Sequence, residues 1–287
     1  MSEKKILVTG ANGQLGSEIR RLETNFPEYK FLFTDYEELS IIDEEAVEKF
    51  FEENRPDYCI NCAAYTAVDK AEEKSEQDLV EKLNADAVGY LAKQCSKYHT
   101  KFLHISTDYV FDGSSSTPYT EADIPNPVSF YGATKLKGEE LALQNTDAII
   151  IRTAWVYSSS GKNFVKTMMR LMQEKTEINV VNDQYGTPTY AADLAAVLLQ
   201  IIKCGKWQSG IYHYSNDGIT TWYQFAMAIK SIKEYSCAVN PIPTASFPTP
   251  AKRPAYSVLN KSKIKEAYHI QPPHWRDSLV ECLKILV

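Results

Sequence analysis

Short apolar runs alternate with amphipathic segments along the first half of the chain. The runs are typical of buried strands and lie at 6–9, 30–34, 58–62, 101–106 and 148–152. Between them, apolar residues recur every three or four positions, which predicts helices at 14–25, 43–54, 78–98 and 130–144. In the helix over 78–98 we expect one inward face made of Leu79, Leu83, Val88, Leu91 and Cys95. Apolar strands separated by helices indicate an α/β fold with a doubly wound parallel sheet.

The second half is less regular. Helices are predicted at 161–175, 191–203, 220–235, 261–268 and 275–286, and short strands at 178–181 and 211–214. Thr220 and Thr221 are candidate caps for the third of these helices. The segment 241–254 holds five prolines and is expected to be an extended connection. We therefore expect a sheet domain over 1–155, rejoined by part of 185–217, and a smaller α/β domain over 156–287.

Composition narrows the classes of function. The 287 residues are 44% hydrophobic and carry a net charge of −6, which argues against a nucleic-acid partner. No apolar run is long enough to cross a membrane, and the N-terminus has no signal-peptide pattern, so a cytoplasmic protein is expected. The six cysteines are then expected to be reduced. Cys59 and Cys62 lie in one predicted strand with side chains on opposite faces, which favours core packing over a zinc site.

A glycine-rich turn follows the first predicted strand. Gly10, Gly13 and Gly16 have the spacing of a Rossmann-type dinucleotide fingerprint, in which the backbone approaches a pyrophosphate and the helix N-terminus binds it. Asp35 closes the second strand. An acid there can bond a ribose 2′-hydroxyl and would repel a 2′-phosphate, which favours NADH over NADPH; a solvated turn aspartate is the alternative.

The predicted helix over 130–144 carries Tyr131 and Lys135 on one face, one turn apart. Reduction of a ketone requires a proton for the developing alkoxide, and we expect the Lys135 ammonium to lower the pKa of the Tyr131 phenol so that it can exchange this proton. Thr107 follows the fourth strand and can donate a second hydrogen bond to the carbonyl oxygen. Asn84 could support a proton-relay water. Alone, a Tyr–Lys pair at this spacing is more often a surface feature, but here it follows a glycine fingerprint.

With these motifs the chain resembles the extended short-chain dehydrogenase/reductases, and among them it is similar to the dTDP-4-dehydrorhamnose reductases. The resemblance covers nearly the whole chain. It depends on the segments 61–72 (NCAAYTAVDKAE), 106–113 (STDYVFDG), 152–157 (RTAWVY), 183–189 (DQYGTPT) and 248–254 (PTPAKRP). It implies reduction of the C4 keto group of dTDP-4-dehydro-L-rhamnose by NADPH, with NADH often accepted, in a monomer or homodimer.

The resemblance also implies which residues form the site. The catalytic residues would be Thr107, Tyr131 and Lys135, with Tyr131 as proton donor. The substrate-binding residues would be Thr107, Asp108, Tyr131, Trp155 and Arg253, although Trp155 could instead be a core aromatic. The loop with Lys252 and Arg253 would reach the substrate diphosphate. The cofactor-binding residues would be Gly10, Asn12, Gly13, Gln14, Leu15, Gly16, Asp35, Ser40, Ile41, Ala63, Ala64, Tyr65, Thr66, Asn84, Ile105 and Lys135.

Some members of the family dimerise around Mg²⁺ held by acidic side chains. Glu18 matches one such position, but Ala192 stands at a second, with Asp193 beside it, which makes a metal doubtful. Three rival functions share this fold. Tyr109 stands where a dehydratase would place an acid, which disfavours dehydration. An epimerase of the same superfamily, or a non-catalytic regulatory subunit of this fold, stays as an alternative.

Overall fold

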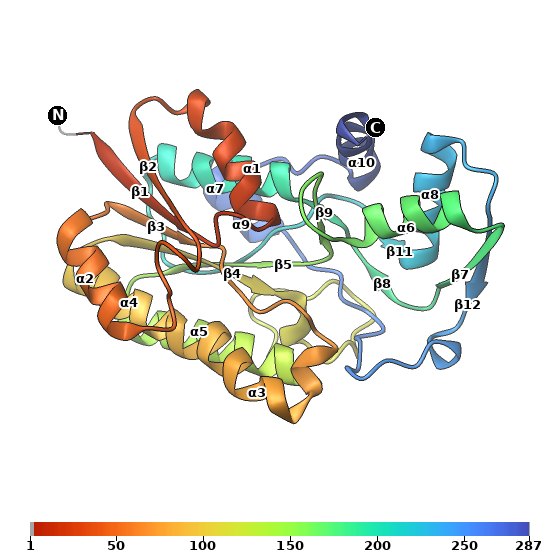
Figure 1. Cartoon of the computed structure of the whole chain (residues 1–287), viewed down its shortest axis with the longest axis horizontal. Coiled ribbons are helices and arrows are strands. Elements are labelled where there is room, and N and C mark those ends of the chain that lie inside the picture. Colours follow the sequence, from red (N-terminus) through yellow and green to blue (C-terminus); the bar gives the residue numbers. More distant parts are fainter. Residues whose placement is uncertain (1–2, 287) are drawn as a thin grey trace.

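A six-stranded parallel sheet forms the centre of the larger part of the molecule. The structure is a computed structural model that describes residues 3–286. Across the sheet the strands follow the order β10 (Gly210–His213), β5 (Ile149–Thr153), β4 (Lys101–Thr107), β3 (Tyr58–Asn61), β1 (Lys4–Thr9) and β2 (Tyr29–Thr34) (Figure 1). The order reverses between β1 and β3. In doubly wound sheets, ligands bind beside such a reversal at the carboxyl ends of the strands.

Helices cover both faces of this sheet, as the sequence pattern predicted. One face is covered by α1 (Gln14–Leu22), α7 (Ala191–Lys203) and α9 (Ser262–Tyr268), and the other by α2 (Glu44–Asn54), α4 (Ala87–Lys97) and α5 (Phe130–Asn145) (Figure 1). Successive strand residues point to opposite faces: Ile149 and Ile151 pack beneath α7, while Ile150 packs in the cluster with α4. Apolar side chains on both sides explain why these strands read as continuous apolar runs.

The long helix predicted over 78–98 is interrupted. It begins earlier, as α3 (Lys74–Glu81), passes through a π-helical turn at η3 (Lys82–Asp86), and continues as α4. A π-turn adds one residue to a helical repeat, so the helix before the turn is rotated relative to the helix after it. For this reason Leu79, predicted to face inward, is 43% exposed, whereas Val88, Leu91 and Cys95 are buried as expected.

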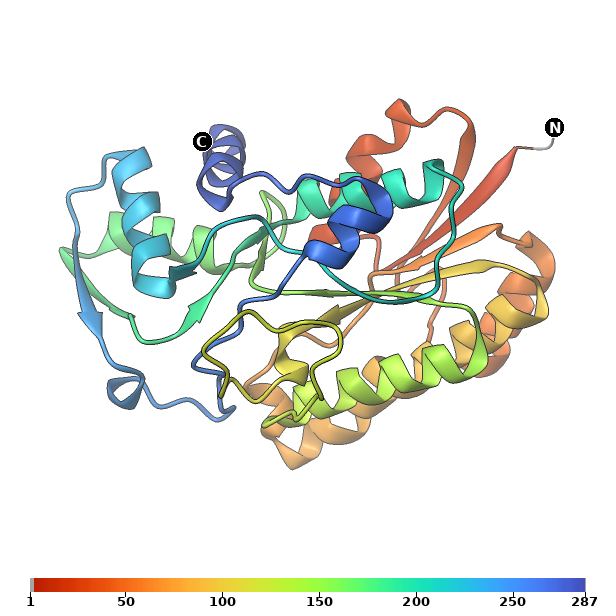
Figure 2. The ribbon, with the colours of Figure 1, turned by 180° about the vertical axis from the view of Figure 1, so that it is seen from behind.

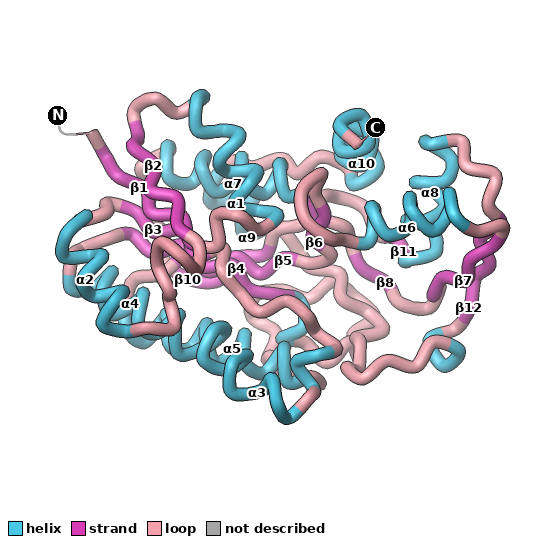
Figure 3. The backbone as a smooth tube through the Cα atoms, in the orientation of Figure 1, coloured by secondary structure: helices cyan, strands magenta, loops and turns pink. Residues whose placement is uncertain are grey.

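The smaller part of the molecule is an α/β layer with short strand pairs. Its elements are α6 (Phe164–Glu174), α8 (Trp222–Lys233), α10 (Trp275–Ile285) and the strands β6 (Val156–Tyr157), β7 (Glu177–Val181), β8 (Tyr185–Gly186), β9 (Thr189–Tyr190), β11 (Thr220–Thr221) and β12 (Ala238–Ile242) (Figure 3). Thr221 caps α8 through a capping box with Gln224. The predicted start of α6 at 161 is three residues early, because Asn163 forms its cap.

The proline-rich segment 241–254 is only partly an extended connection. Pro241 lies within β12, which pairs in parallel with β7, and a 3-10 turn, η5 (Thr244–Ser246), comes next. The chain then crosses back to the sheet at α9 before it returns to end in α10 (Figure 2). All six cysteines are free. Within residues 3–286, no helix is both long and apolar enough to span a membrane.

Candidate active site

The glycine-rich turn after β1 is shaped by close backbone contacts that leave no room for side chains. Gly10 has a φ of +63°, and a Cβ on it would lie 2.7 Å from the Cα of Ala63. A Cβ on Gly16 would lie 2.6 Å from the Cα of Ala11. Gly13 is the cap residue of α1, so this helix has no side-chain cap. Its first-turn N–H groups are therefore open to an anion, which suits a diphosphate.

Asp35, just beyond β2, holds this turn in place. Its Oδ2 accepts a hydrogen bond from the N–H of Asn12 at 2.9 Å, and its Oδ1 accepts one from the N–H of Tyr36 at 2.9 Å. From the sequence, Asp35 is expected to be either a ribose ligand or a solvated residue. The structure adds a third role, because the carboxylate braces the backbone that would contact the nucleotide.

One cleft of about 640 Å³ joins the two ends of the predicted site. It begins at the glycine turn, passes the carboxyl ends of the strands and reaches α5. The predicted site residues that line it are Gly13, Gln14, Leu15, Ala64, Thr66, Ile105, Thr107, Asp108, Tyr131, Lys135 and Trp155. A nucleotide end and an acid–base end thus face a single space, as a nicotinamide-dependent enzyme requires.

The other predicted residues do not line the cleft. They are Gly10, Asn12, Gly16, Asp35, Ser40, Ile41, Ala63, Tyr65, Asn84 and Arg253. Ile41 is buried in the core beneath α2 and α4. Asn84 is buried in the π-turn, where its Oδ1 accepts the Tyr65 N–H at 2.8 Å and its Nδ2 donates to the Tyr65 carbonyl at 3.2 Å. Asn84 thereby fixes the segment after β3, and its suggested role in a proton relay stays a prediction.

Several lining residues were missed by sequence reasoning. They are Cys62, Val68, Ser106, Tyr109, Thr153, Val156, Gly161, Lys162, Asn163 and Leu194. Cys62 could have been found, because it directly follows the carboxyl end of β3. Asn163 could not have been found, because only the tertiary structure brings it to the cleft. Its Nδ2 donates to Oε1 of Gln14 at 2.9 Å and so connects the smaller part of the molecule to the glycine turn.

Tyr131 and Lys135 project from the first turns of α5, which begins with Ser129 accepting the N–H of Gly132. Both side chains are almost fully buried. Lys135 donates from Nζ to the carbonyl of Ile105 at 2.7 Å. Burial raises the pKa of Tyr131 to about 12, with a hydrogen bond to Thr107 acting against the rise and the charge of Asp108 adding to it.

The expectation that Lys135 lowers the pKa of Tyr131 is therefore wrong for this structure. The loss of water around the phenol outweighs the Thr107 hydrogen bond, and the charge of Asp108 acts in the same direction as burial. Burial likewise lowers the pKa of Lys135 to about 8, while Glu139 and Cys62 act in the opposite direction.

Thr107 ends β4, Asp108 follows it, and both line the cleft. The Thr107 hydroxyl donates to Oδ1 of Asp108 at 3.1 Å and accepts the N–H of Tyr109 at 3.2 Å. Asp108 is 2% exposed, and its Oδ2 has no hydrogen-bond partner within the described residues. Burial raises the pKa of Asp108 to about 6, against hydrogen bonds from Ser257 and Thr107 that lower it. An unpaired carboxylate oxygen beside the cleft is suited to accept a hydrogen bond from a sugar hydroxyl.

Trp155 forms an aromatic wall with Trp222. The two rings stack at 3.5 Å between centroids, and Phe164 packs against Trp222 at 4.6 Å. Trp155 has a φ of +49°, and a Cβ on Gly186 would lie 2.6 Å from its ring. Trp155 both lines the cleft and packs against aromatic neighbours, so the two interpretations of this residue are compatible.

Arg253 lies in a two-point ion pair with Asp69. Its Nη1 is 3.0 Å from Oδ1 and its Nη2 is 2.8 Å from Oδ2. The guanidinium holds the pKa of Asp69 below its ordinary value. Arg253 also acts on the pKa of Tyr109, which lines the cleft, so the ion pair lies close to the cleft without lining it.

The acidic residues considered for Mg²⁺ contact protein groups. Glu18 is paired with Arg21 at 3.1 Å. Asp193 accepts hydrogen bonds from Asn216 at 2.7 Å and Ser278 at 2.5 Å. Across residues 3–286, acidic, histidine and cysteine side chains nowhere gather in a group of three or more that could hold a metal.

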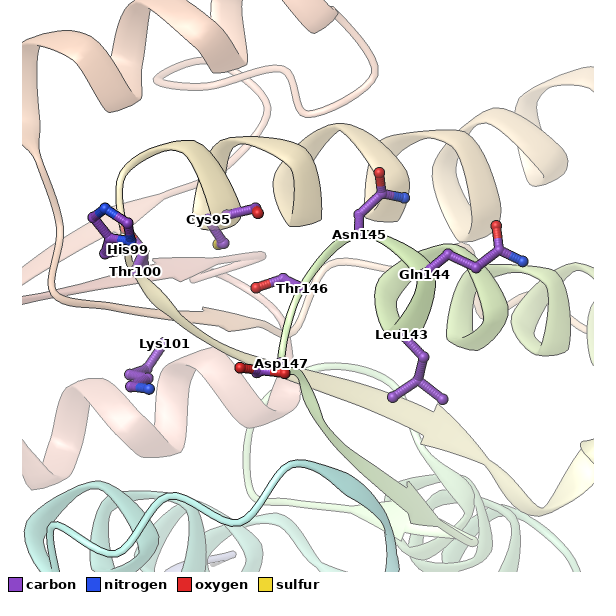
Figure 4. Close-up of a pocket in the computed structure, with 10 residues that line it drawn as sticks. Cys95, His99, Thr100, Lys101, Leu143, Gln144, Asn145, Thr146 and Asp147 are labelled. Atoms are coloured by element: carbon purple, nitrogen blue, oxygen red, sulfur yellow. The ribbon is translucent and has the colours of Figure 1, made fainter.

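A second hollow, of about 400 Å³, lies at the opposite end of β4 and β5 (Figure 4). It is formed by the end of α4, the start of β4 and the connection from α5 to β5. Its labelled side chains are Cys95, His99, Thr100, Lys101, Leu143, Gln144, Asn145, Thr146 and Asp147. None of the predicted site residues lines it. The predicted site residues that line a cavity thus lie at the carboxyl ends of the strands, in the larger cleft.

Comparisons with known proteins agree over the full length. The family model described as RmlD substrate binding domain matches residues 4–287. A dTDP-4-dehydrorhamnose reductase of Aggregatibacter actinomycetemcomitans is 42% identical, with 96% of this chain and 97% of that protein covered. A solved dTDP-4-dehydrorhamnose reductase of Clostridium acetobutylicum is 43% identical, with a TM-score of 0.93 and 98% and 99% of the chains covered. That of Bacillus anthracis, solved in complex with NADP, is 38% identical with a TM-score of 0.94 and the same coverage.

Proposed function

The chain belongs to the RmlD substrate-binding family, and from this premise we propose that it is a dTDP-4-dehydrorhamnose reductase. The reaction is reduction of the C4 keto group of dTDP-4-dehydro-L-rhamnose to dTDP-L-rhamnose, with NADPH as the reductant, in rhamnose and cell-surface polysaccharide synthesis. The single observation that carries the proposal is the cleft in which the glycine turn and the Tyr131–Lys135 pair face one another. Full-length similarity to reductases of this name supports the choice of substrate.

The residues around the glycine turn fit a dinucleotide. A Cβ at position 10 or 16 would fill the space that the turn needs, and the uncapped end of α1 offers N–H groups to a diphosphate. Gly13, Gln14 and Leu15 would hold the diphosphate end, and Lys135 the ribose next to the nicotinamide. When bound, NADPH supplies the hydride. Asp35 already bonds the Asn12 N–H, so a 2′-phosphate would have to be placed away from its carboxylate.

Tyr131 supplies the proton in this proposal. A phenol whose pKa is about 12 keeps its proton throughout the neutral range and is therefore ready to act as an acid. An alkoxide is a stronger base than a phenolate, so transfer of this proton to the C4 oxygen remains favourable. Thr107, which lines the same cleft, would turn its hydroxyl from Oδ1 of Asp108 to donate a second hydrogen bond to the same oxygen.

The sugar nucleotide would be bound by both parts of the molecule. Trp155 offers an apolar face for the 6-deoxy sugar, and Asp108 offers its unpaired Oδ2 to a sugar hydroxyl. Arg253 would turn from Asp69 toward the diphosphate, since a guanidinium matches both carboxylate and phosphate geometry.

The proposed division of labour follows the chain. Residues 1–155, rejoined by part of 185–217, would bind the cofactor, and 156–287 would mainly bind the substrate. Pairing of β10 with β5 and packing of α7 under the sheet support the rejoining. We further propose a cytoplasmic enzyme that works as a monomer or homodimer.

The decisive experiment incubates the pure protein with dTDP-4-dehydro-L-rhamnose and NADPH, or NADH in a parallel reaction, while the absorbance of the reduced nicotinamide is followed. We expect oxidation in equal amount to the dTDP-L-rhamnose formed. An epimerase would convert the sugar without net consumption of cofactor, and a regulatory subunit would leave both unchanged. Either result would overturn the proposal.

A further inference from the structure

Four buried polar side chains form a line that crosses the sheet and ends at Lys135. Thr9 on β1 donates to Oδ1 of Asn61 on β3 at 2.6 Å. Nδ2 of Asn61 lies 3.1 Å from Nδ1 of His104 on β4, and Nε2 of His104 lies 3.3 Å from Nζ of Lys135. Thr9, Asn61 and His104 are each at most 1% exposed, so water does not compete for these bonds.

The orientation of the Asn61 amide is set by its neighbours. Two donors converge on one end of it: the Thr9 hydroxyl at 2.6 Å and the N–H of Ala63 at 3.2 Å. A main-chain N–H can only donate, so the atom that it meets must be the amide oxygen. The opposite end of the amide, which faces His104, is therefore the NH₂ group.

This orientation determines the tautomer of His104. The Asn61 NH₂ donates to Nδ1, so Nδ1 must carry the lone pair. In a neutral imidazole the hydrogen is then on Nε2, pointing toward Lys135. Burial is the largest cause that holds the pKa of His104 well below its ordinary value, and it acts whether or not Lys135 is charged, so the ring remains neutral.

We propose that Asn61 locks His104 as the Nε2–H tautomer, and that this N–H opposes the ammonium form of Lys135 and stabilises its neutral amine. An ammonium would direct one N–H to the Ile105 carbonyl and leave another facing the N–H of His104. A neutral amine satisfies every contact. It donates to Ile105, accepts from His104, and keeps one N–H for the cleft.

The other groups that face Lys135 do not cancel this effect. Glu139, one turn further along α5, is held by Arg152 through Nη2–Oε2 at 2.7 Å, and Cys62 is a neutral thiol whose pKa is raised by burial. Tyr131, one turn earlier on α5, is also neutral at physiological pH. Burial already lowers the pKa of Lys135 to about 8, in the direction that the His104 N–H reinforces.

The inference deepens the proposed function and rests on it for its role in the reaction. After Tyr131 gives its proton to the C4 oxygen, the phenolate must regain one. A Lys135 ammonium can transfer a proton from Nζ to the phenolate oxygen and become an amine, which then takes up the one proton that the reduction consumes from solution. His104 makes this transfer easier because its N–H stabilises the amine. His104 is therefore a positioning residue that acts through Lys135.

The tautomer can be measured directly in the unmodified full chain. Two-bond ¹H–¹⁵N correlation spectra of the ¹⁵N-histidine-labelled protein separate protonated from unprotonated ring nitrogens, and His104→Gln identifies the resonance among the five histidines. We expect a neutral ring with the hydrogen on Nε2 from pH 6 to 9. A hydrogen on Nδ1, or an imidazolium in this range, would overturn the proposal whether or not the protein reduces the sugar nucleotide.

A second measurement follows the titration of Lys135 by ¹³Cε-lysine spectra, with Lys135→Met to assign the signal. In His104→Gln the new side-chain amide can turn its oxygen toward Nζ, so the midpoint of Lys135 should rise by about one pH unit. His213→Gln is the control, since His213 is equally buried but meets the Phe111 ring edge to face and hydrogen-bonds the Tyr119 carbonyl rather than Lys135. An unchanged midpoint in His104→Gln, with the control also unchanged, would contradict the role of His104.

Discussion

Burial moves the pKa values of Tyr131 and Lys135 in opposite directions, although the two side chains lie one turn apart on α5. The pKa of the Tyr131 phenol rises to about 12, and the pKa of the Lys135 ammonium falls to about 8. Both shifts favour the neutral form, because each charged form loses its hydration in the cleft. A site prepared in this way stores its proton on the phenol and has a neighbour that can exchange one near neutrality.

Replacement of Tyr131 by Phe should remove the proton donor with little change of shape. We expect kcat to fall by about 10²- to 10⁴-fold, the range for loss of a general acid. The dissociation constant of NADPH, measured by fluorescence titration, should change by less than about twofold, because in this proposal the Tyr131 hydroxyl does not bind the cofactor.

The matched control is Tyr109→Phe. Tyr109 also lines the cleft, and its ring meets that of Tyr131 edge to face at 5.5 Å between centroids. This variant should retain most of its turnover. If both variants lost kcat equally, or if Tyr131→Phe kept it, Tyr131 would not be the donor.

Replacement of Gly16 by Ala should damage the nucleotide end selectively. The added Cβ would lie 2.6 Å from the Cα of Ala11, so the turn must move. Overpacking of this kind costs about 1–3 kcal/mol, which predicts a loss of NADPH affinity of about tenfold or more by calorimetry. Gly89→Ala is the control within a helix, because a Cβ there meets Leu141 at an ordinary 3.5 Å. It should bind normally and gain up to about 1 kcal/mol of stability.

Asp108 should make stability depend on pH. Burial raises its pKa from 3.8 to about 6, so the folded state holds the proton more tightly than the unfolded state. The resulting stabilisation is fully present below about pH 4 and is lost as the pH rises through about 6. A two-unit difference corresponds to about 3 kcal/mol as an upper value. The free energy of unfolding in urea should therefore change with pH differently for wild type and Asp108→Asn. Between pH 4 and 6 the wild type should lose stability relative to the variant.

The contrasting variant is Asp112→Asn. Hydrogen bonds, first from the N–H and hydroxyl of Ser114, lower the pKa of Asp112 to about 2, so its stabilising contribution is present above about pH 4 and is lost as the pH falls toward 2. A pH-independent difference between wild type and Asp108→Asn would show that Asp108 does not titrate in this range.

Arg253→Gln should weaken substrate binding while leaving the cofactor site intact. Hydrogen bonds to a charged group contribute about 1.5–3 kcal/mol, so KM for the dTDP-sugar should rise by about tenfold to a hundredfold. The affinity for NADPH should not change, because Arg253 lies outside the glycine turn. Lys252→Gln is the neighbouring control: Lys252 is exposed, and its change should have a smaller effect. Equal KM values for wild type and Arg253→Gln would remove Arg253 from the diphosphate site.

The sheet and its covering helices could be predicted from the sequence because each depends on a local pattern. Runs such as Ile149–Thr153 are apolar on both faces, and Thr221 with Gln224 marks the start of α8. The π-turn at Lys82–Asp86 could not be foreseen, because it depends on packing against α5, where Gly138 lets the carbonyl of Asn84 approach. The exposure of Leu79 is a consequence of that turn.

The candidate site likewise contains residues that a local motif predicts and features that only tertiary packing determines. Residues within a motif, such as Gly13 and Tyr131, could be placed in the cleft from the sequence. The pKa shift of Tyr131 could not, since the extent of its burial is a property of the tertiary structure. Asn163 enters the site from a loop 149 positions away from Gln14, with no signal in the intervening residues. Such contacts depend on how distant segments pack, which local pattern does not record.

The edge of β5 is covered by β10, a strand that is synthesised about 60 residues later. Residues 210–213 cover the outer side of β5, so the ribosome has released most of the chain before this edge is closed. Until then Ile149, Ile150 and Ile151 form an unprotected strand edge of the kind that recruits other chains. A fragment ending at residue 155 should therefore aggregate even though it contains the whole glycine turn. The yield of folded protein should therefore depend on how soon β10 pairs with β5, separately from the final stability of the fold.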